Sequence, residues 1–298
     1  MQRNHIYVAG MSYNLRRTIC DYGFGIEIDR FCTAVEMERA GVIESTIAFC
    51  NSLSDPARIP KEDDPSSASS STFGDSVGGG APGSRIVPSL ASFAPAPNHT
   101  IHLPAILHAP FNELHPAAID PQALALARHR FEQAYVTARE LGIHRMVVHT
   151  GWIPFVYFKS WQLERAAMFW QDFIKDKDDI TILIENVMED EPDMLADLIR
   201  SIDHPRIRAA LDIGHARCAS RIPVIEWIQC LGSSIAHFHI HENDGSADQH
   251  LPLGSGCLDA EELLAAIDEC CPKNCTMTIE SHDSYSAAQC LETHGFLD

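Results

Sequence analysis

The sequence has 298 residues, of which 45% are hydrophobic and 21% are charged, which excludes a largely disordered, collagen-like or coiled-coil chain. A net charge of −19, from 22 basic and 41 acidic residues, repels phosphate backbones and anionic lipids, so nucleic acid is a disfavoured partner. No segment approaches the roughly 18 apolar residues of a membrane span, and residues 1–5 lead directly into a strand pattern. We therefore expect a cytoplasmic protein with no membrane partner.

Short apolar strand patterns alternate regularly with longer amphipathic patterns, which is typical of a parallel sheet with crossover helices. The predicted strands cover residues 5–9, 25–29, 103–108, 144–149, 180–184, 207–211, 235–240 and 275–280. The predicted helices cover residues 13–22, 33–50, 121–141, 159–176, 190–202, 221–232, 259–271 and 284–294. Eight strand–helix pairs favour a closed (β/α)8 TIM barrel, a single domain over residues 1–298, because open doubly wound sheets usually have about six strands or fewer.

Residues 51–102 interrupt this alternation. Of positions 61–100, 19 are Ser, Gly or Pro, and such a composition cannot bury enough apolar area to offset the entropy lost on ordering. We therefore expect a flexible insertion between the second helix and the third strand. A lid over the active site is the alternative interpretation.

Histidine and acidic residues recur at the ends of the later predicted strands, where the active face of a TIM barrel forms. They are His108, His149, Glu185, Asp212, His215, His241, Asp248, His250 and Glu280. Each one alone is more often an ordinary hydrogen-bonded residue than a ligand. Such residues at six successive strand ends are hard to explain by structural need, and together they form a shell suited to divalent zinc, manganese or iron.

Electrostatics supports a metal site, because four carboxylates held together without cations would repel one another and take up protons. A single divalent ion would leave this shell negative, whereas three ions would make it positive and attractive to an anionic phosphate. The residue count leaves one to three ions, of zinc or manganese, as alternatives.

Two further residues are candidates for substrate binding. His239 shares a strand face with His241, because side chains alternate along a strand, and it either contacts substrate or metal or is a hydrogen-bonded residue of the barrel interior. Trp152 follows the fourth strand and either lines a substrate pocket or caps the apolar top of the barrel. Gly254 and Gly256 are expected to shape their loop.

The motifs resemble those of the xylose isomerase-like TIM barrel superfamily. It includes sugar phosphate isomerases and epimerases and the endonuclease IV enzymes of AP endonuclease family 2. The most specific stretch is HIHENDGSADQHLPLGSGCLD, which begins at His239, and LDIGHA, LIENV and VVHTG support it. The resemblance covers nearly the whole chain outside residues 51–102.

The isomerases and epimerases of the superfamily imply one metal ion held by Glu185, Asp212, His241 and Glu280. Glu185 and Glu280 would then be catalytic proton-transfer groups, and His215 resembles a substrate-contacting histidine. The implied reaction is isomerisation or epimerisation of a small sugar, polyol or sugar phosphate, by proton transfer next to a carbonyl. The sequence has no obvious phosphate-binding motif, so a phosphorylated sugar is not required. Whether the protein forms a homo-oligomer is left open by the sequence.

The endonuclease IV pattern implies three zinc ions held by nine ligands, and the chain has a counterpart for each. They are His108, His149, Glu185, Asp212, His215, His241, Asp248, His250 and Glu280. A three-zinc hydrolase, either an AP endonuclease or another phosphoesterase, is therefore the alternative function. The sequence lacks a basic stripe with interleaved aromatic residues that would bind DNA.

Overall fold

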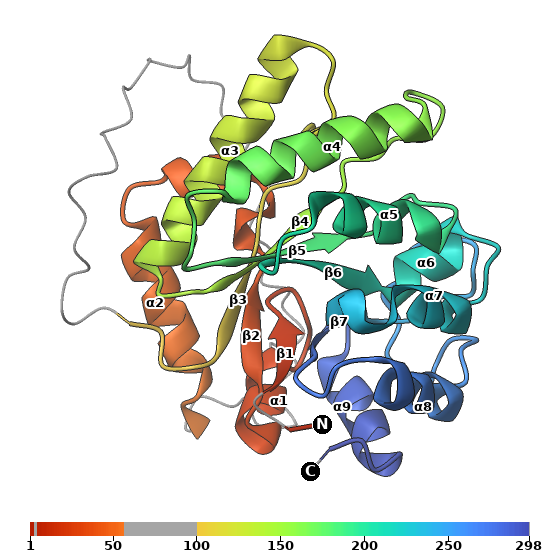
Figure 1. Cartoon of the computed structure of the whole chain (residues 1–298). Coiled ribbons are helices and arrows are strands. Elements are labelled where there is room, and N and C mark those ends of the chain that lie inside the picture. The colour runs from red at the N-terminus through yellow and green to blue at the C-terminus, as the bar shows by residue number, and fades with distance from the viewer. Residues whose placement is uncertain (3–4, 57–99, 298) are drawn as a thin grey trace.

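Parallel strands close into a barrel in the order β1 to β8, with β8 pairing back onto β1 (Figure 1). The computed structural model describes residues 1–2, 5–56 and 100–297. Its strands are β1 (Ile6–Ala9), β2 (Gly25–Ile28), β3 (Ala105–His108), β4 (Arg145–His149), β5 (Thr181–Glu185), β6 (Ile207–Asp212), β7 (Ile235–Ile240) and β8 (Thr276–Ile279). The predicted single-domain (β/α)8 barrel is confirmed, and each predicted strand end lies within two residues of the observed one.

Helices follow the strands and surround the barrel (Figure 1). They are α1 (Leu15–Tyr22), α2 (Val42–Leu53), α3 (Pro121–Glu140), α4 (Lys159–Ile174), α5 (Pro192–Ile202), α6 (Ile213–Ala219), α7 (Val224–Leu231), α8 (Ala260–Cys270) and α9 (Ser284–Thr293). Short 3-10 helices η2 (Arg30–Cys32), η3 (Ala34–Glu38) and η6 (Gly232–Ser234) complete the set in the described residues. The two ends of the chain lie together, and the Met1 amino group donates a hydrogen bond to the Phe296 carbonyl at 2.6 Å.

The predicted helices differ from the structure in two places. The helix expected over 33–50 is interrupted: residues 34–38 form a 3-10 helix, and α2 begins only after Gly41, whose φ of 72° is left-handed. Helix α6 was not predicted; it starts directly after Asp212, whose side chain caps it.

The predicted insertion lies mostly outside the described residues. Helix α2 ends at Leu53, so the first three residues of the segment 51–102 are helical. Residues 57–99 are not described, and the expected flexibility and the alternative role as a lid stay predictions.

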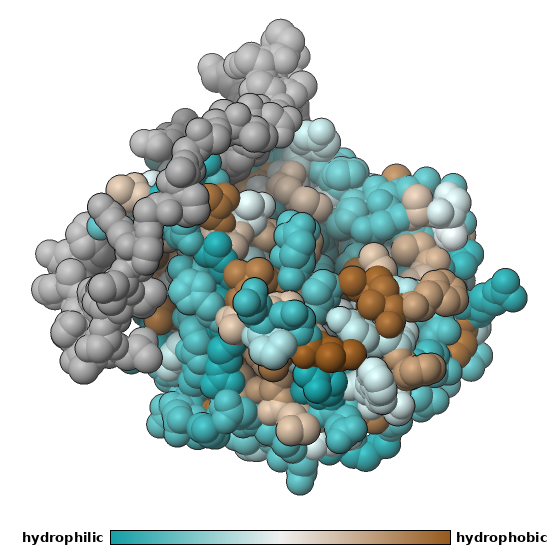
Figure 2. Space-filling view, turned by 90° about the horizontal axis from the view of Figure 1, so that it is seen from above, coloured by the Kyte–Doolittle hydropathy of each residue, from teal (hydrophilic) through white to brown (hydrophobic). Residues whose placement is uncertain are grey.

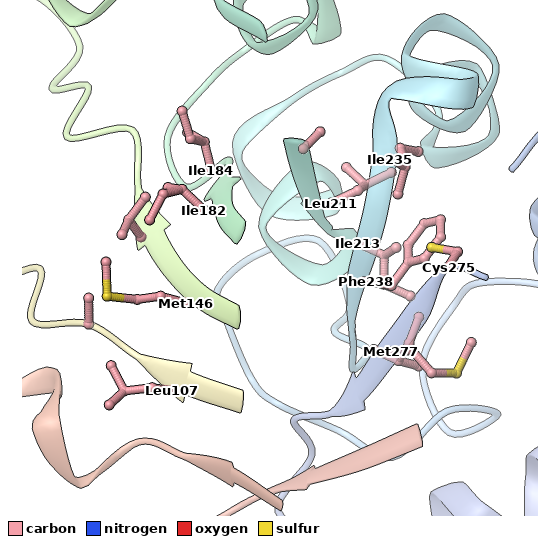
Figure 3. Close-up of a cluster of buried hydrophobic side chains, with 14 of the residues drawn as sticks. Leu107, Met146, Ile182, Ile184, Leu211, Ile213, Ile235, Phe238, Cys275 and Met277 are labelled. Carbon is pink, nitrogen blue, oxygen red and sulfur yellow. The ribbon is translucent and has the colours of Figure 1, made fainter. Parts of the chain in front are cut away.

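Strand side chains alternate between two environments. One set packs outward against the helices, as Leu107, Met146, Ile182 and Leu211 do (Figure 3). Their sequence neighbours form a separate buried cluster of Tyr7, Ile106, Val147, Leu183 and Ala210. Residues two apart share a strand face. This cluster therefore lies on the same strand faces as His108, His149, Glu185 and Asp212, two residues before them along each strand.

The surface seen from above is largely hydrophilic, with apolar residues in separate patches (Figure 2). Within the described ranges, no helix combines the length and the apolar character that crossing a membrane would require.

The packing of α3 on α4 gives a stability test. Phe131 is 1% exposed, and its ring centroid lies 5.0 Å from that of Trp170. We expect Phe131→Ala to lower the free energy of unfolding by about 3–5 kcal/mol, because it removes a buried ring and leaves a cavity. Urea unfolding followed by circular dichroism measures this. Phe155→Ala, at a fully exposed phenylalanine, is the control and should change the value by less than about 0.5 kcal/mol; equal effects would contradict the packing described.

Candidate metal centre

Six strands, β3 to β8, deliver histidine and acidic side chains to one mouth of the barrel. All nine residues predicted as ligands meet there through contacts between neighbouring imidazoles and carboxylates, with His239 joining the Glu280 carboxylate to the rest: His108, His149, Glu185, Asp212, His215, His241, Asp248, His250 and Glu280. The carboxyl ends of parallel barrel strands share one rim, so residues far apart in the sequence converge.

The central group consists of Glu185, Asp212, His239 and Glu280, whose ligand atoms all lie within 4.8 Å of one another. His239 Nδ1 is 3.0 Å from Glu185 Oε1, 2.8 Å from Glu280 Oε2 and 3.7 Å from Asp212 Oδ2. The resemblance implied His241 as the histidine of this set. In the structure the histidine of this group is His239, whereas His241 lies in a neighbouring group with Asp212 and His215. Which of the two binds metal and which binds substrate stays a prediction.

His108 and His149 flank Glu185 on one side. Their Nε2 atoms lie 3.2 and 3.4 Å from Glu185 Oε2. The other carboxylate oxygen of Glu185 faces His239 and His215. Phe111 stacks on His149, with ring centroids 4.2 Å apart, so the outer wall of this side is apolar.

His215, His241, Asp248 and His250 form the opposite side. His241 Nε2 is 3.0 Å from Asp212 Oδ2, and His215 Nε2 is 3.4 Å from Asp248 Oδ2. His250 Nε2 is 2.9 Å from the same Asp248 oxygen, and its ring stacks on His241 with centroids 4.2 Å apart. Asp248 therefore joins His215 to His250.

Backbone contacts fix the ends of β5 and β6. The Asn186 side chain donates to the Asp212 carbonyl and accepts from the Asp212 amide, both at 2.9 Å. Asp212 Oδ1 accepts the His215 amide at 2.7 Å and so caps α6. Its second oxygen faces His241. One residue therefore starts the helix and contributes to the group, and α6 carries His215 into place.

Gly214, at the start of α6, leaves room for the imidazole of His241. A Cβ built at this position would lie 2.0 Å from His241 Cε1 and 2.3 Å from Nδ1. A larger residue at 214 would therefore displace that ring.

The loop after β7 is held by a fully buried acid, Glu242. Its backbone pairs with Leu251 in both directions at 2.8 Å, and its side chain accepts the amides of Gly254 and Leu258. A Cβ at Gly256 would approach Glu242 Oε2 to 2.2 Å, which agrees with the expected loop-shaping role of this glycine. The loop carries Asp248 and His250, and His250 Nδ1 contacts the Glu280 carbonyl at 2.7 Å.

Glu27 of β2 was not predicted as a site residue. It is 2% exposed, and its carboxylate lies 3.1 Å from His239 Nε2. The signal was present in the sequence as a single acid within the apolar strand GIEI. Trp152, the predicted substrate contact, follows β4 and is 7% exposed; its role stays a prediction.

The model of the family described as xylose isomerase-like TIM barrel matches residues 98–293. The chain belongs to this family.

Related proteins agree with that assignment. MJ1311, an uncharacterized protein of Methanocaldococcus jannaschii, is 30% identical over 175 residues, or 55% of this chain and 60% of that protein. The match thus spans less than two thirds of that relative. A probable endonuclease 4 of Mycobacterium leprae is 28% identical over 201 residues, or 63% of this chain and 77% of that protein. A solved D-tagatose 3-epimerase-like protein has a TM-score of 0.67 at 21% identity, covering 98% of this chain and 96% of that one, which shows a common fold.

Opposite charges govern protonation at this xylose isomerase-like centre. Burial raises the pKa of the Glu185 carboxyl, but His239 and His149 outweigh burial and hold that pKa well below its usual range. Burial also opposes ionisation of Asp212, yet His215 and His241 hold its pKa low. The carboxylates are therefore ionised at neutral pH, as metal ligands must be.

The residues present fit a divalent ion. His241 Nδ1 is buried without a hydrogen-bond partner among the described residues, although such atoms are normally paired. Glu280 Oε2 is buried too, and its 2.8 Å contact with His239 Nδ1 is an ion-pair contact without hydrogen-bond geometry. Both belong to groups of side chains that could hold a metal ion. Imidazole nitrogens and carboxylate oxygens are ligands that zinc and manganese accept.

Asp29, just after β2, gives a pH test. Burial raises the pKa of its carboxyl to about 6; the Met11 amide lowers it, and Glu27 and Glu280 raise it. Since the folded pKa exceeds the unfolded value of 3.8, the favourable contribution of neutral Asp29 is present below about pH 4 and is lost as pH rises through 6.

Ionisation of Asp29 should lower the free energy of unfolding by ~1 kcal/mol. We therefore expect the unfolding temperature of Asp29→Asn to lie about 2–4 °C above that of the wild-type protein at pH 8, and the two temperatures to agree near pH 4. Thermal unfolding in EDTA at the two pH values measures the difference. Asp176→Asn, at an exposed position, is the control. A pH-independent effect of Asp29→Asn would contradict the assigned protonation.

Proposed function

We propose that the protein is a metal-dependent isomerase or epimerase of a small sugar, polyol or sugar phosphate. The observation that carries the proposal is the convergence of the Glu185 and Glu280 carboxylates on one nitrogen, His239 Nδ1, at 3.0 and 2.8 Å. They come from β5 and β8, on different sides of the barrel mouth. A substrate carbon between them would therefore meet a carboxylate on each side.

The proposed reaction moves a proton at the carbon next to a carbonyl. A divalent ion held by Glu185, Asp212, His239 and Glu280 would polarise the carbonyl and hydroxyl oxygens of the sugar. One of Glu185 and Glu280, as the carboxylate, would take the proton from the carbon, and the other, carrying a proton gained from solvent, would give that proton to the opposite face. Each glutamate would then exchange its proton with solvent. His215, whose imidazole is partly exposed beside Asp248, is the expected contact for a substrate hydroxyl, and Trp152 the expected wall.

Proteins of the same fold indicate which sugars to test first. D-psicose 3-epimerase structures with D-tagatose and with D-fructose have TM-scores of 0.65 and 0.63 to this chain, at 12% identity. Identity this low is evidence for the fold alone. The substrate therefore has to be established by experiment, and these two ketoses and their phosphates are the first probes.

Exchange of solvent deuterium into the sugar tests the reaction. We expect the manganese- or zinc-loaded protein to label the carbon next to the carbonyl, and Glu280→Gln to slow this by at least about 100-fold, because it removes a proton-transfer group. Proton NMR in D2O measures the exchange, and Glu261→Gln, at an exposed position of α8, is the control. Unchanged exchange in Glu280→Gln would refute its role, and no exchange with any ketose would refute the function.

A second candidate is a three-zinc hydrolase of phosphoesters, such as an AP endonuclease. The favouring observation is that His108, His149, Asp248 and His250, which a single central ion does not need, also adjoin the group. The relatedness to a probable endonuclease 4 points the same way. The net charge of −19 opposes DNA as the substrate.

His250→Ala separates the two candidates. Under the one-metal proposal the variant keeps one ion per chain and most of its deuterium exchange, because His250 does not belong to the central group. Metal analysis by mass spectrometry, sugar exchange and cleavage of abasic-site DNA are measured together. Three zinc ions in the wild-type protein, falling to two in the variant with loss of DNA cleavage, would instead establish the hydrolase.

A further inference from the structure

Glu27 places a carboxylate inside the barrel, beneath the central group. It lies in the middle of β2, paired in register with Ala9 of β1 and Ile106 of β3. At 2% exposure, it has lost nearly all contact with solvent. A buried carboxylate is costly unless hydrogen bonds and charge compensate it, so its partners define what it does.

The main partner of Glu27 is the imidazole of His239. His239 Nε2 lies 3.1 Å from Glu27 Oε1 and 3.2 Å from Oε2. Thr278 Oγ1 donates a further hydrogen bond to Glu27, and His237 Nε2 lies 3.4 Å from Oε2. The carboxylate is therefore held from two strands, β7 and β8, and has little freedom to turn away from His239.

The two nitrogens of His239 face different environments. Nε2 faces Glu27, while Nδ1 faces Glu185, Asp212 and Glu280. A carboxylate that accepts the Nε2 proton fixes the tautomer in which Nδ1 carries a lone pair. That lone pair is what a metal ligand requires.

We propose that Glu27 is a positioning residue, which fixes the orientation and tautomer of His239 so that Nδ1 binds the divalent ion of the central group. The inference rests on the proposed metal-dependent function and adds a residue to it. Glu27 lies outside the central group, on the Nε2 side of His239, and it acts on the ion through His239. Carboxylates of this kind behind a ligating histidine typically change metal affinity by about 10–100-fold.

Metal affinity of the full-length protein tests the inference. The protein is stripped with a chelator, and its dissociation constant for Zn²⁺ or Co²⁺ is measured by competition with a chromophoric chelator. We expect Glu27→Gln, which removes the charge at almost constant volume, to weaken binding by about 10–100-fold. The visible spectrum of the Co²⁺ form should change as well, because the imidazole ligand is no longer held.

Thr276→Val is the matched control. Thr276 is also buried, at 3% exposure, and contacts His237 Nδ1 at 2.7 Å, but it is not among the partners of His239 described above. It should leave the metal affinity unchanged. Equal weakening in both variants would show that Glu27 only fills the barrel interior, and a Glu27→Gln affinity equal to wild type would likewise overturn the inference.

A double-mutant cycle tests whether Glu27 acts through His239. In a His239→Ala background, Glu27→Gln should cause no further loss of affinity, since the positioned ligand is gone. Additive losses would overturn the inference. If Glu27→Gln does not fold, as judged by circular dichroism of the metal-free protein, Glu27→Asp, which withdraws the carboxylate by one methylene, carries the same expectation. Absence of metal binding by the wild-type protein would overturn the proposed function itself, together with the inference.

Discussion

The mutual repulsion of carboxylates at the barrel mouth is the constraint on which the site depends. Glu185 and Asp212 are 1% and 0% exposed, and Glu280 lies beside them. In a setting with so little water, like charges this close must be compensated by cations or lose their ionisation. Imidazoles surround each carboxylate, and the low pKa values of Glu185 and Asp212 follow from that arrangement. The carboxylates are thus already ionised, as metal binding requires, whereas imidazoles such as His215 and His239, whose pKa values the neighbouring carboxylates raise despite burial, must lose a proton to bind metal.

The same repulsion explains why several buried polar side chains fix the backbone around these carboxylates and imidazoles. Asn186 ties the end of β5 to β6, Asp212 caps α6, and Glu242 closes the loop that carries Asp248 and His250. Each of these contacts uses a polar side chain to satisfy backbone amides or carbonyls. Because the strand ends and the loop after β7 are fixed, the imidazoles have little freedom to turn into solvent. Both the backbone and the attraction to the carboxylates therefore keep them in place.

The sequence was sufficient to predict the barrel and to bring the candidate ligands to one mouth, because both depend on regular spacing. Strand patterns repeat with polar residues at their ends or in the segments that follow, and this rule predicted that the nine candidate ligands meet at one mouth; their role as ligands stays a prediction. The helix over 33–50 was wrong because Gly41 adopts a left-handed conformation, which the apolar pattern does not reveal. Helix α6 was missed because it follows its strand without a loop. Glu27 and the central position of His239 depend on depth inside the barrel, and spacing along a strand gives the face but not the depth.

Gly214 connects this geometry to sequence variation among relatives. Since the ring of His241 occupies the space where a Cβ would stand, the two positions are sterically linked. A homologue with a side chain at 214 must carry a smaller residue at 241 or shift the start of α6. Pairs of substitutions at these positions would therefore mark where a lineage has given up the imidazole next to Asp212, and with it one side of the ligand group.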